Sequence, residues 1–404
     1  MKRAEDILHR IWSTRGPVST LLLPLSFLYG WLSGIHLRRQ SRRAWRAPVP
    51  VIVIGNILVG GTGKTPLAQA LCAYLQSQGR HPGLISRGYG TRIGARPHLS
   101  IDAQDSHWLG DEPALLHAAT RVPVAVHPRR ALAAQALLAA CPEVDVLIAD
   151  DGLQHRALAR DVEIIVQDAR GVGNGRLLPA GPLREPATRR LQADWLVTHL
   201  TAPPAQGASI HQRAPDQDAC ANQRAPGHDA RGHQPAPDQG ASTDQRAPGH
   251  ESADPAAGHE HTCRRVNMHL RAACAEHLGS GLKQSWAVWR EQYSGQAVSA
   301  VAGIGQPQRF FSMLRGQGLV LQDTLAPPDH GLLSGADLAR LPPGPILLTT
   351  KDAIKCRPPY DERLWVIHAQ PAFAPAAWMA DVLARLDRIA AGKPRPQPDA
   401  QALE

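Results

Sequence analysis

Residues 49–66 read VPVIVIGNILVGGTGKTP, and they carry the strongest single signal in the 404-residue chain. Its apolar opening, Val49–Ile54, predicts a short buried strand. Its close, GGTGKT, supplies glycines that let backbone N–H groups turn toward an anion, and Lys64 can reach the β- and γ-phosphates of a nucleotide. An apolar stripe at helical spacing follows directly: Leu67, Leu71, Tyr74 and Leu75. Strand, glycine turn and helix together predict a phosphate-binding loop.

The expected nucleotide contacts all lie in this loop: Gly60, Gly61, Thr62, Gly63, Lys64, Thr65 and Pro66. The hydroxyl of Thr65 is an expected Mg²⁺ ligand. The usual pattern GxxxxGK(S/T) fails by one residue, because Leu58 stands where its first glycine belongs. A glycine-rich turn without a ligand is the alternative, and the strand before the loop and the helix after it argue against that reading.

The first half alternates short β-branched runs with helical patterns. Further strands are predicted at Gly83–Ser86, Val122–Val126, Val144–Ala149, Val162–Gln167 and Trp195–Thr198, and a helix at Ala131–Ala140. Such alternation predicts a parallel sheet covered by helices on both faces, with ligands bound beyond the carboxyl ends of the strands. Asp150 and Asp151 end the apolar run VDVLIADDG at that edge, so we expect both to bind Mg²⁺, directly or through water.

The composition excludes several classes of protein. Hydrophobic residues make up 43% of the chain, enough for a packed core, and the formal net charge is +9. These values rule out a wholly disordered chain, a collagen-like chain and a polytopic membrane protein. The six cysteines contain no CxxC pair, so neither a disulfide framework nor a zinc site is expected.

Pro17–Ile35 is an uncharged run, just long enough to cross a bilayer core of about 30 Å. A cluster of basic residues follows it: Arg38, Arg39, Arg42, Arg43 and Arg46. The run leads into the phosphate loop rather than an exported domain, so we reject a secretory signal, and the arginines place the rest of the chain in the cytoplasm. Because Pro24 and Gly30 interrupt the run, a helix lying in the membrane interface is as plausible as a span, and a buried core helix is a third reading. The apolar run makes an anionic membrane surface, and not nucleic acid, the expected partner of the arginines.

Residues 202–262 form a low-complexity insert without Phe, Trp, Tyr, Leu or Val. The unit QRAP recurs at Gln212, Gln223 and Gln245, with QPAP at Gln234. A proline in every unit excludes a helix, and the shortage of apolar residues predicts a disordered loop that is neutral for catalysis. Its histidines fit a solvated polar tract better than a metal site.

Five segments are expected: a membrane-associating segment (1–46), a nucleotide-binding domain (47–201), the insert (202–262), a smaller C-terminal α/β lobe (263–391) and a flexible tail (392–404). Within the C-terminal lobe we predict strands at Ala297–Ala302, Leu319–Asp323, Ile346–Thr350 and Leu364–His368, with a helix from Gln306 to Gly316. A final helix presents Trp378, Val382, Leu383 and Leu386 on one face. The predicted fold class is α/β: a P-loop NTPase-like parallel sheet, a smaller α/β lobe and an N-terminal membrane-associated helix.

A phosphate loop alone does not choose among nucleotide-dependent enzymes. A GTPase should carry (N/T)KxD, and Thr350-Lys351-Asp352 falls one residue short, so we discount GTP. A kinase needs a base that activates its acceptor. GDEP at 110–113 and PDH at 328–330 can supply one, although each reads equally well as a turn or a surface loop.

The sequence resembles the lipid A 4′-kinase (tetraacyldisaccharide 4′-kinase) family over nearly the whole chain outside 202–262. The motifs that carry this resemblance are RAWRAPVPVIVIGN (43–56), GGTGKTP (60–66), SRGYG (86–90), GDEP (110–113), DDGLQH (150–155), GNGRLLPAGPLREP (173–186), AGIGQPQRFF (302–311), PDH (328–330) and TTKDAIKC (349–356). The family's phosphate loop has the same nonstandard form, which removes the objection at Leu58.

The resemblance implies ATP-dependent phosphorylation of the 4′-hydroxyl of a tetraacylated glucosamine disaccharide 1-phosphate, giving lipid IVA at the cytoplasmic face of the bacterial inner membrane. It implies that Asp111 is the base, assisted by His330, with Lys64 at the phosphates. Glu112, Asp150 and Asp151 would organise Mg²⁺ together with Thr65.

The substrate contacts that the resemblance implies are Arg87, Arg130, Gln154, His155 and Arg184. Two of these have alternatives, because Arg184 could form a structural ion pair and Arg130 could be a solvated residue at a helix start. Two other classes of function stay open. A P-loop ATPase or chaperone at the membrane would not need Asp111, and a noncatalytic membrane scaffold would not need the intact Lys64-Thr65 and Asp150-Asp151 pairs. Acyl-chain preference and oligomeric state are not readable from the sequence.

Overall fold

The computed structural model describes residues 11–88, 93–101, 109–201, 263–328 and 333–393, with the side chains of Asp111 and Glu112 left undescribed. The insert predicted at 202–262, the PDH residues after Pro328 and the tail after Lys393 lie outside the described residues. All described residues belong to one compact unit.

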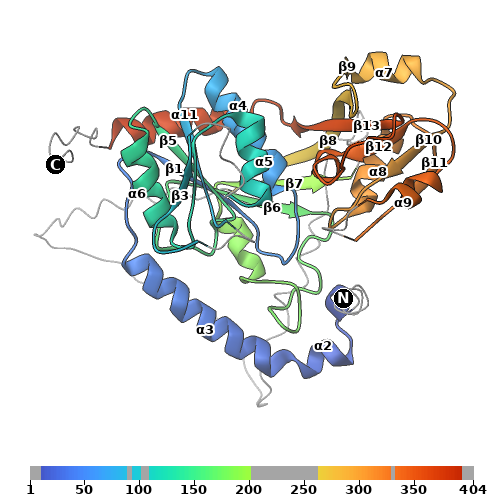
Figure 1. The fold of residues 1–404 in the computed structure, drawn as a ribbon. Helices are drawn as coiled ribbons and strands as arrows, with labels where there is room; N and C mark the ends of the chain where they lie inside the picture. The colour runs from blue at the N-terminus through green and yellow to red at the C-terminus, as the bar shows by residue number, and fades with distance from the viewer. Residues whose placement is uncertain (1–10, 89–92, 102–108, 202–262, 329–332, 394–404) are drawn as a thin grey trace, which may run out of the picture. The chain divides into compact units, whose positions relative to one another are not determined.

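The first half of the chain forms a parallel sheet around the predicted first strand (Figure 1). Its strands, in spatial order, are β7 (Trp195–Leu200), β6 (Val162–Asp168), β1 (Val51–Gly55), β5 (Val146–Asp150), β2 (Pro82–Ser86), β4 (Val124–Val126) and β3 (His98–Ser100). Only β3, at the edge, runs antiparallel to its neighbour. The carboxyl ends of β1, β5 and β6 therefore meet at one edge, as predicted.

Helices cover both faces of this sheet because alternate residues of β1 face opposite sides. Ile52 and Ile54 pack in one core cluster with α4 (Lys64–Ser77), whose Leu71 is fully buried. Val51 and Val53 pack in a second cluster with α6 (Arg130–Ala140). A further helix, α5 (Asp111–Thr120), lies beside α4, and the short 3₁₀ helix η2 (Ala187–Gln192) precedes β7. The predicted α/β class with a P-loop sheet is confirmed.

The sheet continues into the second half of the chain without a break. Strand β8 (Arg264–His277) pairs parallel with β7, and β13 (Leu364–Ala374) pairs antiparallel with β8. The sheet then extends through β12 (Ile346–Thr349), β10 (Val298–Val301) and β11 (Leu321–Leu325), and β9 (Lys283–Ser285) pairs with β8. The helices of this half are α7 (Trp286–Gln292), α8 (Pro307–Gly316), α9 (Gly335–Ala339) and α10 (Thr350–Ala353).

The final helix, α11 (Trp378–Ala391), returns to the first half. Its buried Trp378, Val382 and Leu386 join the core cluster that contains α4 and one face of β1. The ammonium of Lys393 then bonds to the carbonyl oxygen of Val49 at 2.7 Å, just before β1. The C-terminal segment therefore stabilises the strand that leads into the phosphate loop.

The N-terminal helices α2 (Pro17–Leu21) and α3 (Leu23–Arg42) bind the 172–184 segment through a set of buried polar contacts. Ser26 Oγ donates to Leu177 O at 2.9 Å, Asn174 Nδ2 donates to Ser19 Oγ at 3.0 Å, and Tyr29 donates to the carbonyl oxygen of Arg184 at 3.2 Å. These contacts fix one face of the helix pair on the protein.

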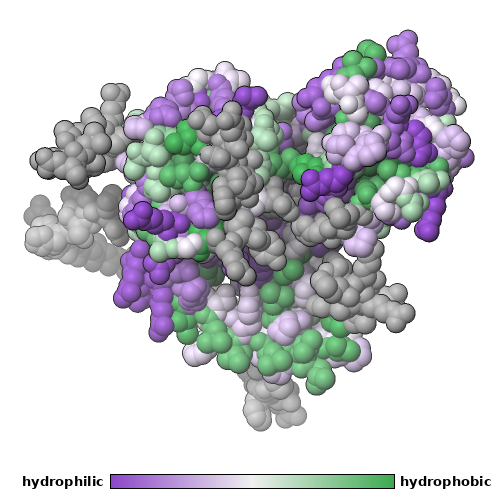
Figure 2. Space-filling view, viewed as in Figure 1, coloured by the Kyte–Doolittle hydropathy of each residue, from purple (hydrophilic) through white to green (hydrophobic). Residues whose placement is uncertain are grey.

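The other face of α2 and α3 is apolar and exposed, and Figure 2 shows hydrophobic side chains gathered along this pair of helices. The exposed set is Val18, Leu21, Leu25, Phe27, Leu28, Trp31 and Leu32. Within the part of the chain that the structure describes, no helix has both the length and the apolarity to cross a bilayer.

Candidate active site

The phosphate loop occupies the turn between β1 and α4, as the sequence predicts. Gly60 and Gly63 have φ values of 99° and 98°, a left-handed region that favours glycine. A side chain at position 63 is also excluded by space, because an added Cβ would lie 2.5 Å from Nδ1 of His199. Lys64, Thr65 and Pro66 then form the first turn of α4, whose N-terminal N–H groups favour an anion.

Leu58 explains why the loop departs from the usual pattern. It is buried in a cluster with Ile57, Leu153 and Leu183, and it forms an isolated antiparallel bridge with Leu183. The chain at this position therefore belongs to the core, and the cradle begins only at Gly60.

Two of the predicted site residues meet Asp151 at the mouth of the loop. Lys64 Nζ lies 3.4 Å from Asp151 Oδ1, and Arg184 NH1 lies 3.7 Å from the same oxygen. Burial alone would raise the pKa of Asp151, but the positive charges of Lys64 and Arg184 outweigh it and hold that pKa below the usual range. The ion pair that we kept as the alternative for Arg184 is present, and it joins Arg184 to the site.

Arg130 is a buried cation beside these carboxylates. It is the first residue of α6 and only 2% exposed, so the alternative of a solvated residue is wrong. NH1 donates to His127 O at 3.0 Å, whereas Nε and NH2 are buried and make no hydrogen bond within the described residues. Burial lowers the pKa of Arg130 to about 10, although Asp151 and Asp150 oppose that shift. Unpartnered buried N–H groups next to a phosphate loop fit an anionic ligand.

The last two residues of the DDGLQH turn, Gln154 and His155, have different surroundings. His155 lies near Arg130 and Arg87, and burial together with these two charges lowers its pKa to about 4. Gln154 Nε2 donates to Asn56 O at 3.1 Å and to Glu185 Oε1 at 2.9 Å, so its amide ties the exit of β1 to Glu185. The exposed side chain of Arg87 follows directly after β2.

The proposed base cannot be placed by its side chain. Asp111 and Glu112 begin α5 after Gly110, whose φ is 87°, but their side chains are not described. His330 lies outside the described residues. The predicted pairing of Asp111 with His330 therefore stays a prediction.

The donor set suits magnesium better than a metal held by protein alone. Within the described ranges, no group of three or more His, Cys, Asp and Glu side chains could hold a metal ion. Mg²⁺ usually takes one or two carboxylates together with substrate phosphates and water. The ionised carboxylate of Asp151, the neighbouring Asp150 and the hydroxyl of Thr65 fit that requirement.

Four residues that we did not assign to the site from the sequence lie behind the loop. Asp168, at the end of β6, pairs with Arg170 (Arg170 NH2 to Oδ2, 2.7 Å) and with Arg309 of α8. Burial would raise the pKa of Asp168, and its bonds and charge pairs with the two arginines lower it overall. His199, at the end of β7, places Nδ1 3.2 Å from the carbonyl oxygen of Thr62. Two signals were available: Asp168, like Asp150, ends an apolar strand, and Arg309 lies within the motif AGIGQPQRFF (302–311).

The TKD motif has a structural role in this chain. The carboxylate of Asp352 is fully buried, accepts the N–H of Gly303 at 3.0 Å and the hydroxyl of Thr349 at 2.6 Å, and pairs with Lys355. Both oxygens of this carboxylate therefore bond protein partners, and Asp352 ties α10 to the end of β12 and to Gly303.

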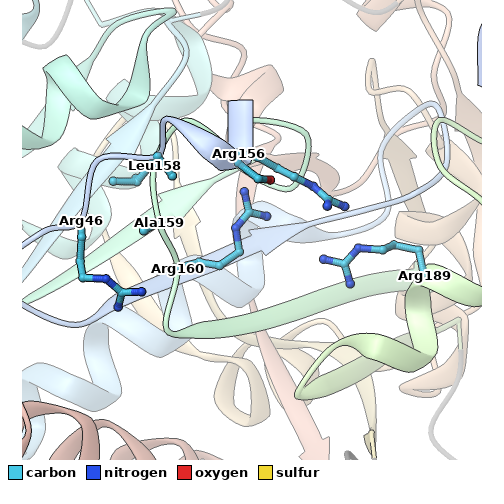
Figure 3. A pocket seen from close by; sticks show the side chains of 8 residues that line it. Arg46, Arg156, Leu158, Ala159, Arg160 and Arg189 are labelled. Carbon is cyan, nitrogen blue, oxygen red and sulfur yellow. The ribbon is translucent and has the colours of Figure 1, made fainter. Parts of the chain in front are cut away.

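A separate cavity of about 350 Å³ lies beside the end of α3 (Figure 3). Arg46, Arg156, Arg160 and Arg189 line it, and Figure 3 shows their guanidinium groups turned toward a common space. Carboxylates compensate these charges: Arg156 pairs with Glu185, Arg160 and Arg189 pair with Glu163, and Arg46 pairs with Asp161. The lining contains none of the predicted site residues, and its charge network connects to the site through Glu185, which also accepts from Gln154.

Comparisons with known proteins identify the family of the chain. A family model named LpxK and described as tetraacyldisaccharide-1-P 4′-kinase matches residues 18–387. A tetraacyldisaccharide 4′-kinase of Bordetella petrii is 43% identical over 392 residues, 95% of this chain and 96% of that protein. One of Herminiimonas arsenicoxydans is 39% identical, over 92% of this chain and 94% of that protein.

A solved structure supports the fold independently. The crystal structure titled "apo" form LpxK from Aquifex aeolicus in complex with ATP matches with a TM-score of 0.61 at 22% identity. The match covers 91% of this chain and 99% of that one. The resemblance drawn from the motifs is confirmed: this chain belongs to the tetraacyldisaccharide-1-P 4′-kinase family.

Proposed function

We propose that this chain transfers the γ-phosphoryl group of ATP to the 4′-hydroxyl of a tetraacylated glucosamine disaccharide 1-phosphate, forming lipid IVA for lipid A synthesis. The match of residues 18–387 to the family model carries this assignment. The enzyme is therefore a phosphotransferase with an alcohol as acceptor, and the P-loop ATPase and scaffold alternatives are not favoured.

In the proposed reaction, the loop and the start of α4 bind the phosphates of ATP. Backbone N–H groups of Gly60 to Gly63 bind phosphate oxygens, and Lys64 neutralises charge on the β- and γ-phosphates. Asp150, Asp151 and Thr65, with Glu112, would hold Mg²⁺, which would supply positive charge to offset that of the phosphates. Because Lys64 already contacts Asp151, the carboxylate keeps the lysine directed at the loop before nucleotide arrives.

The acceptor end needs a base and cationic contacts. We assign proton acceptance from the 4′-hydroxyl to Asp111, with His330 orienting it; such proton transfer contributes about 10²–10⁴-fold to rate. Arg130, whose buried Nε and NH2 have no hydrogen-bond partner in the described part of the chain, is assigned to an anionic oxygen of ATP or of the disaccharide. Arg87, Gln154, His155 and Arg184 complete the substrate side.

The exposed apolar face of α2 and α3 brings the enzyme to its lipid substrate. One face of α3 is held on the protein by Ser26 and Tyr29, so the opposite face can enter a membrane surface while the helix lies along it. Arg38, Arg39, Arg42, Arg43 and Arg46, all exposed, attract anionic lipid. We place this contact at the cytoplasmic face of the bacterial inner membrane and assign no nucleic-acid partner.

The test combines purified enzyme, ATP, Mg²⁺ and the disaccharide 1-phosphate in detergent, with chromatographic detection of phosphorylated lipid. Wild type should form product, and Asp111→Asn should lose at least about 100-fold in kcat while still binding ATP. Undiminished transfer by Asp111→Asn would remove Asp111 from the role of base. Absence of lipid product from wild type would overturn the function itself.

A further inference from the structure

Side chains bond every carbonyl of the phosphate loop from Val59 to Thr62. Asn56 Nδ2 donates to Gly60 O at 3.0 Å, and His199 Nδ1 lies 3.2 Å from Thr62 O. Arg309 NH1 donates to Gly61 O at 3.3 Å. Arg170 reaches two of these carbonyls, Val59 O through NH1 and Gly61 O through NH2, each at 3.5 Å.

The geometry of the peptide bond links these carbonyl contacts to anion binding. In a planar trans peptide the C=O of one residue points opposite to the N–H of the next. A side chain that holds the carbonyl of residue 59, 60, 61 or 62 therefore directs the N–H of residue 60, 61, 62 or 63 away from itself. Among the described residues, none of these four N–H groups donates to a protein acceptor. Four consecutive N–H groups left for a ligand are what a phosphate cradle requires.

Arg170 and Arg309, which bond the loop carbonyls, are in turn fixed by a shared carboxylate. Asp168 is 2% exposed and binds both Arg170 and Arg309, so one buried carboxylate fixes two guanidinium groups behind Gly60 and Gly61. An added Cβ at Gly60 would lie 3.5 Å from Arg170 NH1, which shows how closely the guanidinium approaches the backbone. Strand β6, which ends at Asp168, pairs with β1, and β7, which carries His199, lies next to β6, but Arg309 comes from α8 in the second half.

We infer that Arg309 is a positioning residue for ATP: together with Asn56, Arg170 and His199 it holds the loop carbonyls outward, so that the nucleotide grip depends on α8 of the second half. This inference rests on the proposed function and extends it to residues that contact no substrate. Loss of the Arg309 side chain should loosen the loop and weaken phosphate binding, while the acceptor site, built from other elements, keeps its affinity for lipid.

The experiment measures steady-state kinetics of Arg309→Ala and Arg309→Lys against both substrates. Because the guanidinium bonds Gly61 O and pairs with Asp168, Arg309→Ala should raise KM for ATP roughly ten-fold or more. KM for the lipid acceptor should stay within about two-fold of wild type, because substitutions away from a binding site usually have small effects. Arg309→Lys, which retains charge and one donor toward Gly61, should recover part of the lost ATP affinity.

Arg363 provides a matched control in the same half of the chain. It also pairs with an aspartate, Asp361, and also bonds backbone carbonyls, that of Leu338 in α9 and those of Leu341 and Pro342 after it. Arg363→Ala should lower the melting temperature but leave KM for ATP unchanged. If Arg309→Ala and Arg363→Ala changed KM for ATP alike, or if Arg309→Ala left it unchanged, the inference would be wrong.

The outcomes separate this inference from the proposed function. A wild-type enzyme without lipid phosphorylation contradicts the function, whatever the variants do. An active wild type whose Arg309→Ala form retains full ATP affinity contradicts the positioning role alone. If Arg309→Ala fails to fold, Arg309→Gln, which keeps much of the volume but removes the charge, carries the test, and wild-type KM for ATP in a folded glutamine variant refutes the role.

Discussion

Lys64 and Asp151 face each other across the mouth of the phosphate loop, with 3.4 Å between the ammonium nitrogen and Oδ1. The first comes from the start of α4 and the second from the turn after β5, where Asp151 adopts a left-handed φ of 49°. A non-glycine residue in that conformation carries a conformational cost, which the surrounding contacts must offset. The structure thus maintains this carboxylate–ammonium pair at the place where phosphoryl transfer would occur.

Removal of the Lys64 ammonium is expected to impair transfer severely. Lys64→Ala leaves the loop backbone in place but removes the cation that offsets charge on the transferred group. Loss of one such preorganised donor typically costs about 10²–10³ in kcat. Single-turnover measurement of lipid phosphorylation tests this, with Lys351→Ala, on α10 in the second half, as a control for loss of a lysine. A Lys64→Ala rate within ten-fold of wild type would contradict the assignment.

Stability should fall as the medium is acidified through the titration range of His199. Burial, helped by Arg309, lowers the pKa of His199 from 6.5 to about 4, although the carbonyl of Thr62 and Asp168 oppose the shift. Between these two pH values the unfolded chain binds a proton that the folded chain does not, so acidification favours unfolding. Urea unfolding at pH 7 and pH 5 measures the loss.

The variant His199→Gln keeps an amide donor near Thr62 but cannot titrate, so its stability should depend less on pH over that range. His36→Gln, on the exposed side of α3, serves as the control. Equal pH slopes for wild type and His199→Gln would show that the buried imidazole does not set the slope.

Membrane binding should depend on the exposed apolar side chains of α3. Phe27 and Trp31 are 74% and 65% exposed, and full burial of one large apolar side chain contributes about 1.5–3 kcal/mol. The double variant Phe27→Ser/Trp31→Ser should therefore bind anionic vesicles at least about ten-fold more weakly in co-sedimentation. Val320→Ser removes an equally exposed apolar side chain, 84% exposed, from the second half and should leave binding unchanged. Equal losses in the two variants would indicate nonspecific stickiness rather than a membrane-binding face.

The insert should be replaceable by a neutral linker. Strands β7 and β8 are parallel neighbours, with Trp195 opposite Arg264 and Leu200 opposite His269, so the chain must return along the whole strand, roughly 16 Å, between them. Parallel connections usually take a dozen or more residues. Replacing 205–260 with about twelve Gly and Ser residues should keep kcat within a few-fold of wild type. A collapse of activity in a folded linker variant would show that the repeat contributes to catalysis.

A bare deletion of 205–260 is the stricter comparison. It leaves only 201–204 and 261–263 to make the return, so we expect it to lower the melting temperature more than the linker variant does. If both variants melted at the same temperature, the pairing of β7 with β8 would tolerate a shorter connection than parallel geometry requires.

The sequence predicted the elements whose signal is local. The strand before the loop, the stripe of Leu67 and Leu71, and the carboxylates after β5 all appear where periodicity and strand ends place them. Strand β8 was missed, although Val266 and Met268 alternate with polar residues, because its later residues mix arginine, histidine and alanine without a clear period. The short edge strand β3 was missed as well, since three residues carry no periodic signal.

The parts of the site that no local pattern could reveal are contacts between distant segments. Arg309 is about 250 positions from Gly61 in the chain, and nothing around it indicates a loop carbonyl as its partner. Arg130 similarly reads as an ordinary residue at a helix start, and only the packing of α6 against the sheet shows that its guanidinium is buried beside Asp150 and Asp151. Both residues depend on tertiary packing, which propensity and spacing do not encode.

In the proposed reaction, a phosphoryl group held at the loop around Lys64 is transferred to a lipid-borne sugar hydroxyl. The most direct measurement is position-resolved ³¹P NMR of the lipid product after incubation with ATP, Mg²⁺ and the disaccharide 1-phosphate, with ADP counted in parallel. We predict one new phosphomonoester at the 4′ position for each ADP formed, and none with Lys64→Ala. ADP release without a new lipid phosphate, or a phosphate at another hydroxyl, would contradict the account.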